Sequence, residues 1–507
     1  MGEIAVAASC QDTHSLRCHS ADVLARYEFD GLEKWLCSSQ AHALSLGDIE
    51  VQEQRRGREL LRLLLQAHVE SRGEGNVGEA IRVYHPDTPP REYALYAQKR
   101  VHVRRIITVF GEIYVSRIGY GREGKKSIHP LDELLQLPAR KYSYEIQRLV
   151  VKRAVQGPFD EVVDAVFEAT GVRIPKRSTE KIVIEASADF YSFYARRRGS
   201  GGKRTGSILV GSIDCKGIPM VKSELTQKKV RRGKGQKAQK KKMATVATVF
   251  TQDPYVRTPE EVVESLFPTG EAPGKSRHKS SGPQRKRVWA SLQASKDWFI
   301  TDVKKEMDRR DPRGKKSHVV VTDGERALQR RVCLMIDDAV LVLDLLHVLE
   351  RLWAAGHALY GEGTEEAVVF VRLRTLRLLR GEVSQVVKGL RQIATKRRLK
   401  GKTAEALLGA ASYYYRNKSR MRYNEYLAKG LPIASGSVEG ACKNLIKDRM
   451  ERSGMRWSSD GAEAMVKMRA IYLSRDFDEY WGWHTTKDQE RLYPEARWEP
   501  AVTVVPK

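Results

Sequence analysis

Cysteine is scarce in this sequence, and long apolar runs are missing from it. Six cysteines among 507 residues exclude a disulfide scaffold, and their scattered positions fit a reducing cytosol. The longest apolar runs are short, such as the leucines at 63–65, and none approaches the ~18–20 residues of a membrane span. The first residues, MGEIAVAASCQDTHSL, lack the basic start and the continuous apolar segment of a signal peptide. We therefore expect a cytoplasmic protein with no membrane partner.

Acidic residues are too few to balance the basic ones. Ninety Lys and Arg against 63 Asp and Glu leave a formal charge of +27. This surplus favours a polyanion partner, and nucleic acid is the usual one; the alternative is a charge that only keeps the protein in solution. Hydrophobic residues make up 41% of the chain, which excludes global disorder. We expect about three domains and a nucleoid-associated protein that binds double-stranded DNA.

The N-terminal region, residues 1–140, is predicted to be mainly helical with one β-hairpin. A helix over about 25–72 places four leucines on one face, namely Leu60, Leu61, Leu64 and Leu65. That face indicates ordinary helix packing or, alternatively, self-association. Residues 101–119 are rich in Val, Ile and Tyr around a Phe-Gly-Glu turn at 110–112, which predicts a β-hairpin.

Residues 141–198 show the rhythm of a helix-turn-helix. One helix covers about 143–155, a second follows Pro158 and ends at Gly171, and a third starts near Ser178. The third helix begins with polar and basic residues, which is typical of a DNA-reading helix. We expect DNA contacts from Lys176, Arg177, Thr179 and Lys181. The alternative is a plain helical hairpin.

After a Gly-rich linker at 199–206, apolar strands alternate with helices. Strands are predicted at 207–214, 217–221, 243–250, 317–324 and 339–344, helices at 287–310 and through most of 347–427, and a final helix from 431–439 to about 452. This order, β-β-β-α-β-α-β followed by a helical insertion and a last helix, is that of an RNase H-like α/β core. The predicted domains are the core at 205–346 and 431–476, an insertion at 347–430 and a tail at 477–507.

Two basic segments interrupt this core. Residues 228–242 hold nine Lys and Arg and no acid, and they include Lys228, Lys229, Arg231 and Arg232. Residues 275–287 hold six. Two such segments in one α/β domain favour phosphate contact over a merely solvated loop. In the insertion, residues 413–423 interleave tyrosines with arginines, either to stack bases or, alternatively, to pack tyrosines in the core.

Three acids stand out by their position in this pattern. Asp214 and Asp323 each follow an apolar strand, and Glu439 starts the last helix. Carboxylates at the carboxyl edge of an α/β sheet lie where ligands bind. Three oxygen donors suit Mg²⁺ or Mn²⁺, and two such ions catalyse phosphodiester cleavage. An Asp after a strand is also a common loop or cap residue, so the prediction depends on the three acids together.

Four segments resemble a known family. They are SIDCKGIPMVK, KKMATVATVFTQDPYVRTPEEVV, VVVTDGERAL and GSVEGACKNLIKDRMERSGMRWS, and they are similar to the DDE transposases of bacterial insertion sequences, specifically the ISKra-type family. The resemblance implies an RNase H-like catalytic core, two divalent ions, and cleavage and joining of DNA at the ends of a mobile element. It implies that Asp214, Asp323 and Glu439 are the catalytic and metal-binding triad. We expect a homodimer or higher oligomer on DNA.

Further residues are predicted to support this chemistry. Asp344 and His347 form an Asp-x-x-His pair, like one found in several groups of DDE transposases, and we expect His347 to be an accessory catalytic residue rather than a metal ligand; the alternative is a buried histidine. Near the last helix, DNA contacts are predicted for Lys443, Lys447, Arg449, Arg456 and Trp457. The functional alternatives are a DNA-binding regulator without catalysis and an RNase H-like nuclease that cuts without joining.

Overall fold

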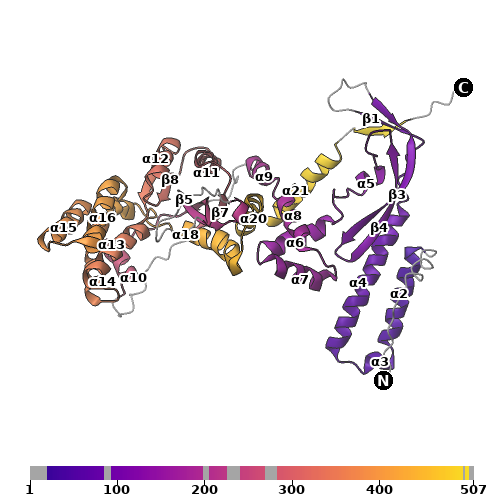
Figure 1. The fold of residues 1–507 in the computed structure, drawn as a ribbon, viewed down its shortest axis with the longest axis horizontal. Helices are drawn as coiled ribbons and strands as arrows, with labels where there is room; N and C mark the ends of the chain where they lie inside the picture. Colours follow the sequence, from indigo (N-terminus) through magenta and orange to yellow (C-terminus); the bar gives the residue numbers. More distant parts are fainter. Residues whose placement is uncertain are drawn as a thin grey trace. The chain divides into compact units, whose positions relative to one another are not determined.

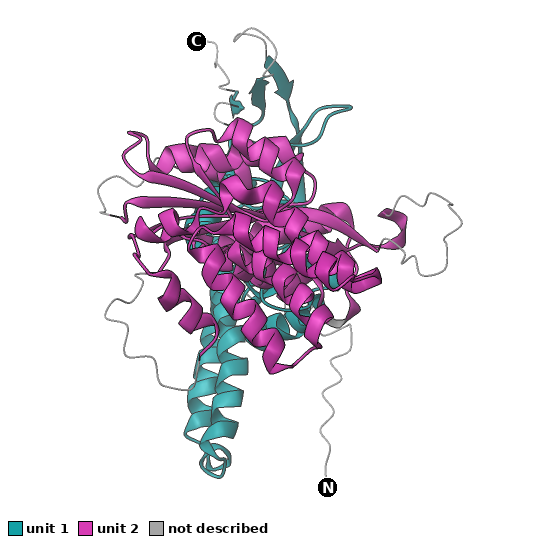
Figure 2. Ribbon diagram, turned by 90° about the vertical axis from the view of Figure 1, so that its left-hand side faces the viewer, with its two compact units in different colours: residues 1–189, 478–507 teal, residues 190–477 magenta. Residues whose placement is uncertain are grey.

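The computed structural model describes residues 20–84, 93–197, 205–224, 240–268, 282–494 and 497–501. It divides into two compact units, residues 1–189 with 478–507 and residues 190–477, shown in two colours in Figure 2. Most of the predicted C-terminal tail at 477–507 belongs to the first unit. Within the described residues, no helix has the length and apolarity that a membrane crossing requires.

The first unit begins with helices α2 (Ala21–Leu36), α3 (Ser39–His42) and α4 (Leu46–Ser71), of which α2 and α4 pack together (Figure 1). The predicted leucine face is wrong: Leu61 and Leu64 are 45% and 49% exposed, and α4 buries Leu63, Gln66 and Val69 instead. Gln66 is buried because its amide donates to the carbonyl of Tyr114 and accepts from the Tyr114 N–H, both at 2.8 Å. A polar residue thus replaces an apolar one on the buried face.

Two small sheets follow in the first unit. Strands β1 (Ile81–Tyr84), β2 (Tyr93–Tyr96) and β10 (Trp498–Pro500) form one sheet in the order β10-β1-β2. Strands β3 (Gln98–Thr108) and β4 (Gly111–Gly121) form an antiparallel hairpin in which Thr108 pairs with Gly111. The predicted hairpin is confirmed. Gly111 has φ +131°, a conformation that favours glycine at the turn.

Three helices then pack against one another, α6 (Tyr144–Ala154), α7 (Phe159–Thr170) and α8 (Lys176–Ala186). Their predicted positions agree with the structure, and Gly171 ends α7 in the left-handed region at φ +70°. The short helix α5 (Pro130–Leu134) and α21 (Phe477–Leu492) complete the helices. Asp189 accepts from Arg491 at 2.7 Å and from His484 at 2.8 Å, which ties α21 to the chain after α8.

The second unit is built on a five-stranded mixed sheet. Its strands are β5 (Ile208–Pro219), β6 (Lys241–Gln252), β7 (Gln284–Ser291), β8 (Ser317–Thr322) and β9 (Val340–Leu343), in the order β7-β6-β5-β8-β9. The first three are antiparallel, and β5, β8 and β9 are parallel. This topology is compatible with an RNase H-like core.

Two predicted elements of this sheet are wrong. Residues 217–221 are not a separate strand, because β5 continues to Pro219 in register with β6. Residues 287–310 are not one helix but the edge strand β7 followed by α11 (Lys296–Arg310). Strand β7 tolerates Arg287 in its buried face because Glu306 of α11 accepts from its guanidinium at 2.6 Å. The sequence pattern alone did not indicate this ion pair between Arg287 and Glu306.

Helices cover the sheet and form the predicted insertion. They are α9 (Phe190–Arg196), η2 (Lys222–Glu224), α10 (Pro259–Leu266), α12 (Arg326–Met335), α13 (Leu345–Tyr360), α14 (Glu365–Leu379), α15 (Val383–Lys396), α16 (Gly401–Asn417), η3 (Lys418–Arg420) and α17 (Tyr423–Ala428). The insertion shares one hydrophobic core with the sheet, since Val319 and Val342 belong to the same cluster as Leu352, Leu378 and Leu407. It is therefore packed against the core.

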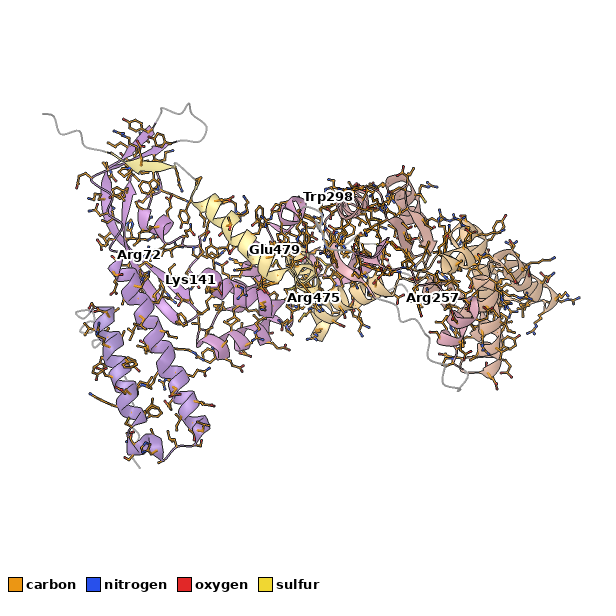
Figure 3. All side chains as sticks on the ribbon, turned by 180° about the vertical axis from the view of Figure 1, so that it is seen from behind. Arg72, Lys141, Arg257, Trp298, Arg475 and Glu479 are labelled. Atoms are coloured by element: carbon orange, nitrogen blue, oxygen red, sulfur yellow. The ribbon has the colours of Figure 1, made fainter. Side chains whose placement is uncertain are left out.

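On α11, Trp298 (labelled in Figure 3) stacks edge-on against Tyr191 at 4.8 Å.

The last part of the second unit is helical but irregular. It runs through α18 (Gly436–Ala441), the π-helix η4 (Cys442–Lys447), α19 (Asp448–Met450), η5 (Arg452–Gly454) and α20 (Ser459–Leu473). The single predicted helix to about 452 is thus broken by a π-helical turn. Such turns frequently occur at functional sites because they change which side chains face a neighbour.

Candidate active site

Asp214 and Asp323 lie side by side on neighbouring strands. Strands β5 and β8 are parallel, with Ile213 opposite Thr322, so the next residue on each strand is one of these two aspartates. Asp323 follows the end of β8, as predicted, whereas Asp214 lies within β5 because that strand continues to pair with β6. Burial raises the pKa of Asp323 above its ordinary value, and the nearby charge of Asp214 adds to this rise.

Asp344 and His347 form the predicted pair. Strand β9 ends at Leu343, and Asp344 caps α13 by accepting from the Leu346 N–H at 2.9 Å. His347 Nδ1 lies 2.9 Å from Asp344 Oδ2, so Nδ1–H donates to the carboxylate. This hydrogen bond, opposed by partial burial, raises the pKa of His347 to about 9. The carboxylate therefore fixes the orientation of the ring and favours its protonated form.

Ser435 holds the same carboxylate from the other side. Its hydroxyl donates to Asp344 Oδ2, and its backbone N–H donates to Oδ1 at 3.2 Å. Asp344 is fully buried. Although burial disfavours its charged form, the hydrogen bonds from His347 and Ser435 hold the pKa of Asp344 below its ordinary value. Ser435 is the N-cap residue of α18, but its side chain makes no capping hydrogen bond there.

Glu439 of α18 reaches the Asp344–His347 pair. One ligand atom from each of Asp344, His347 and Glu439 lies within 4.8 Å of the others, which is close enough to hold one ion. Among the described residues, Asp214, Asp323 and Glu439 do not form a group as tight as this one. Burial raises the pKa of Glu439, and the charge of Asp344 contributes to the rise. Five functional groups therefore share one edge of the sheet.

This edge suits a divalent cation. Within the described ranges, no lysine or arginine forms an ion pair with Asp214, Asp323 or Glu439. Carboxylates that are partly buried and close to one another repel unless a cation offsets their charge. Carboxylate oxygens are the donors that Mg²⁺ and Mn²⁺ prefer, whereas the protonated ring of His347 is not a metal ligand. The donor set therefore fits the expected cofactor.

The π-helical turn connects the last helices to β5. The Cys442 thiol at the start of η4 donates to Asp214 Oδ2 at 3.2 Å, and the Cys215 N–H donates to Oδ1 at 2.6 Å. Cys442 is buried, and burial raises the pKa of its thiol above its ordinary value. The thiol thus stays protonated and acts as a hydrogen-bond donor that orients Asp214.

Three buried tyrosines support the site, a role that the sequence analysis did not assign to them. The hydroxyl of Tyr423 donates to the carbonyl of Leu343 at 2.8 Å, and that of Tyr414 donates to the carbonyl of Val348 at 2.8 Å. These bonds fix the chain on both sides of the Asp344–His347 pair. Tyr413 packs against Gly324, where any Cβ would overlap its ring. For these tyrosines the alternative of core packing is confirmed.

The basic residues predicted near the last helix differ in exposure. Lys443, Lys447 and Arg456 are exposed, so their side chains remain available for DNA. Arg449 and Trp457 are buried, and this corrects the prediction that they contact DNA. The Arg449 guanidinium lies 5.1 Å from the Trp457 ring, whose Nε1–H donates to the Met450 carbonyl at 3.0 Å. These contacts connect Trp457 to the end of α19.

The residues of the predicted DNA-reading helix also differ in exposure. Lys176, Arg177 and Lys181 of α8 are exposed, and Lys176 pairs with Asp160 at 2.8 Å. Thr179 is fully buried, in a helix that packs against α6 and α7, and this corrects the prediction that Thr179 contacts DNA. The basic residues Lys228, Lys229, Arg231 and Arg232 lie outside the described residues.

Comparison with known proteins gives little further information. No protein-family model matches the chain, and no curated protein does. Among solved structures, the Drosophila P element transposase strand transfer complex is similar over 69% of this chain and 82% of that chain, with 8% sequence identity and a TM-score of 0.25. A TM-score of this size assigns neither a fold nor a function.

Proposed function

We propose that the chain is a DNA transposase of the DDE type, resembling the ISKra-type family. It binds the ends of an insertion sequence and catalyses metal-dependent cleavage and strand transfer. The observation that carries this proposal is the group of carboxylates at one edge of a mixed sheet, where Asp214 and Asp323 lie on neighbouring strands and Glu439 faces the Asp344–His347 pair. A basic chain of +27 supplies the affinity for DNA.

Each residue of this edge has its own task. Asp214, Asp323 and Glu439 would hold two Mg²⁺ or Mn²⁺ ions, which would supply activation of the attacking oxygen and stabilisation of the leaving oxygen. Asp344 fixes His347 through Nδ1 at 2.9 Å, which leaves Nε2 as the ring nitrogen that faces the substrate. The protonated ring then donates its Nε2–H to a phosphate oxygen. His347 acts as the accessory catalytic residue.

Three groups of basic residues bind the DNA. The exposed Lys443, Lys447 and Arg456 follow the catalytic glutamate and grip the strand. The exposed Lys176, Arg177 and Lys181 of α8 read the element ends, and the basic segment 228–242 adds salt-dependent, sequence-independent affinity. A homodimer or higher oligomer on the DNA joins the two ends in the nucleoid.

The test uses purified protein, Mg²⁺ and labelled duplexes that carry the element ends. Asp214→Asn, Asp323→Asn and Glu439→Gln should each abolish cleavage while end binding in EDTA survives, because each change removes an anionic ligand and little volume. Asp337→Asn is the matched control, since Asp337 is exposed and precedes β9 at its other end. Normal cleavage by any triad variant removes that residue from the site. Cleavage without joined products identifies a nuclease, and binding without cleavage by the unmodified chain identifies a regulator.

A further inference from the structure

The helical insertion carries a groove that lies outside the catalytic edge. Helices α15 and α16 pack side by side (Figure 1), and a groove of about 530 Å³ opens between them. Its charged and aromatic lining comes from Lys388, Arg391 and Lys396 of α15 and from Tyr415 of α16. The remaining lining residues are neutral, so no carboxylate of the described residues lines the groove. A concave surface with charge of one sign attracts ligands of the other sign.

The basic residues of this groove differ from others in the same insertion. Arg372 and Arg380, on and beside α14, pair with glutamates of α10 at 3.1 and 2.7 Å. Lys388, Arg391 and Lys396 are exposed, and no ion pair joins them to a carboxylate in the described part of the chain. The charge of the groove is therefore not neutralised by the protein itself.

The arrangement along α15 suits a nucleic-acid strand. Lys388 and Lys396 are separated by about 12 Å along the helix, which is the axial length of about three to four nucleotides of one DNA strand. Arg391 lies between them, with its guanidinium 5.5 Å from the Tyr415 ring. Tyr415 is 64% exposed, whereas the neighbouring Tyr414 is fully buried. The ring thus supports the arginine at the surface instead of filling the core.

We propose that this groove, made of Lys388, Arg391, Lys396 and Tyr415, binds the phosphate backbone of duplex DNA. The inference rests on the proposed function, since it names a second surface that holds the DNA on which the catalytic edge acts. Lysine and arginine side chains contact the phosphates without reading sequence. The groove therefore adds affinity for any duplex and does not select the element ends.

The experiment measures binding of the full chain to a short fluorescent duplex of arbitrary sequence, in EDTA, over a range of salt concentrations. Each phosphate contact contributes about 0.9 to the slope of log K against log salt. The variant Lys388→Ala with Arg391→Ala should lower that slope by about 1.8, and Lys396→Gln alone by about 0.9. Tyr415→Leu should weaken binding by about two- to five-fold, because it removes the ring that supports Arg391.

The matched control is Arg372→Ala with Arg380→Ala, which removes the same charge from the same insertion but only from residues already paired with glutamates. It should leave the slope unchanged. Equal slopes for the groove variant and the unmodified chain overturn the proposal, and so does an equal loss in the control. If the unmodified chain cleaves its element ends but the groove variant has the same salt slope as the unmodified chain, the groove proposal is refuted and the proposed function stands. If the unmodified chain binds no duplex, both fail.

Discussion

Replacing Asp344 with Asn tests the electrostatic core of the site. The change keeps the shape of the side chain and a hydrogen-bond acceptor for His347 Nδ1, which lies 2.9 Å from the carboxylate. It removes the negative charge that raises the pKa of His347 from 6.5 to about 9. In the variant, the pKa of His347 should therefore return toward 6.5.

The size and sign of the stability effect follow from this pKa. A difference between 6.5 and about 9 corresponds to about 3 kcal/mol. This is an upper limit, because the His347 side chain keeps 29% of its exposure to water. The folded state has the raised pKa, so the stabilisation is full below about pH 6.5, falls as the pH rises and is lost above about pH 9. The stability gap between wild type and variant should shrink by up to about 3 kcal/mol over that range.

The assay is urea unfolding of both proteins in EDTA, at about pH 6 and about pH 10. Selective labelling of histidine gives the pKa of His347 by NMR, with His347→Gln to assign its signal. In the His347→Gln background, Asp344→Asn should cost the same free energy at both pH values. A wild-type His347 that titrates near 6.5, or a stability gap independent of pH, refutes this account of the pair.

Two further predictions concern packing around the site. Glu306→Gln should destabilise the second unit by about 3–5 kcal/mol in urea unfolding, because it strands the buried arginine of β7 that Glu306 contacts; Asp308→Asn, an exposed acid on the same helix, should cost about 1 kcal/mol or less. Gly324→Ala should slow cleavage at unchanged DNA binding, because its Cβ would overlap the Tyr413 ring beside Asp323, whereas Gly436→Ala, which has nothing within 4 Å, should leave cleavage unchanged.

Sequence patterns predicted correctly those features that depend only on residues close together in the sequence. The β3–β4 hairpin depends on strand-forming residues on both sides of a turn glycine. Gly171 ends α7 because the backbone there adopts the left-handed conformation that glycine favours. The Asp344–His347 pair was predicted because residues three apart on a helix share a face. These features need no knowledge of distant contacts.

The wrong predictions concern residues whose burial depends on contacts with distant parts of the sequence. Gln66 is buried because a strand about 48 residues away offers its backbone, and Arg287 is buried because α11 supplies Glu306. Thr179 and Arg449 lie in polar, basic stretches whose composition is typical of an exposed surface, yet both are fully buried, and the Arg449 guanidinium lies against the Trp457 ring. Periodicity treats every polar residue as solvated, so a polar residue satisfied by a distant partner is assigned to the wrong face.

The position of Glu439 shows why the long insertion does not disturb the site. The insertion leaves the core just after Asp344 and returns just before Ser435, and Ser435 bonds to the Asp344 carboxylate through both its hydroxyl and its backbone N–H. The Leu345 N–H donates to the Ile433 carbonyl at 2.9 Å, which closes the same junction with a second contact. Because both ends of the insertion meet at one buried carboxylate, its length sets the sequence spacing between the acids but not their distance in space. The spacing of 116 residues between Asp323 and Glu439 therefore carries no information on geometry, and the short segment around Ser435 carries it instead.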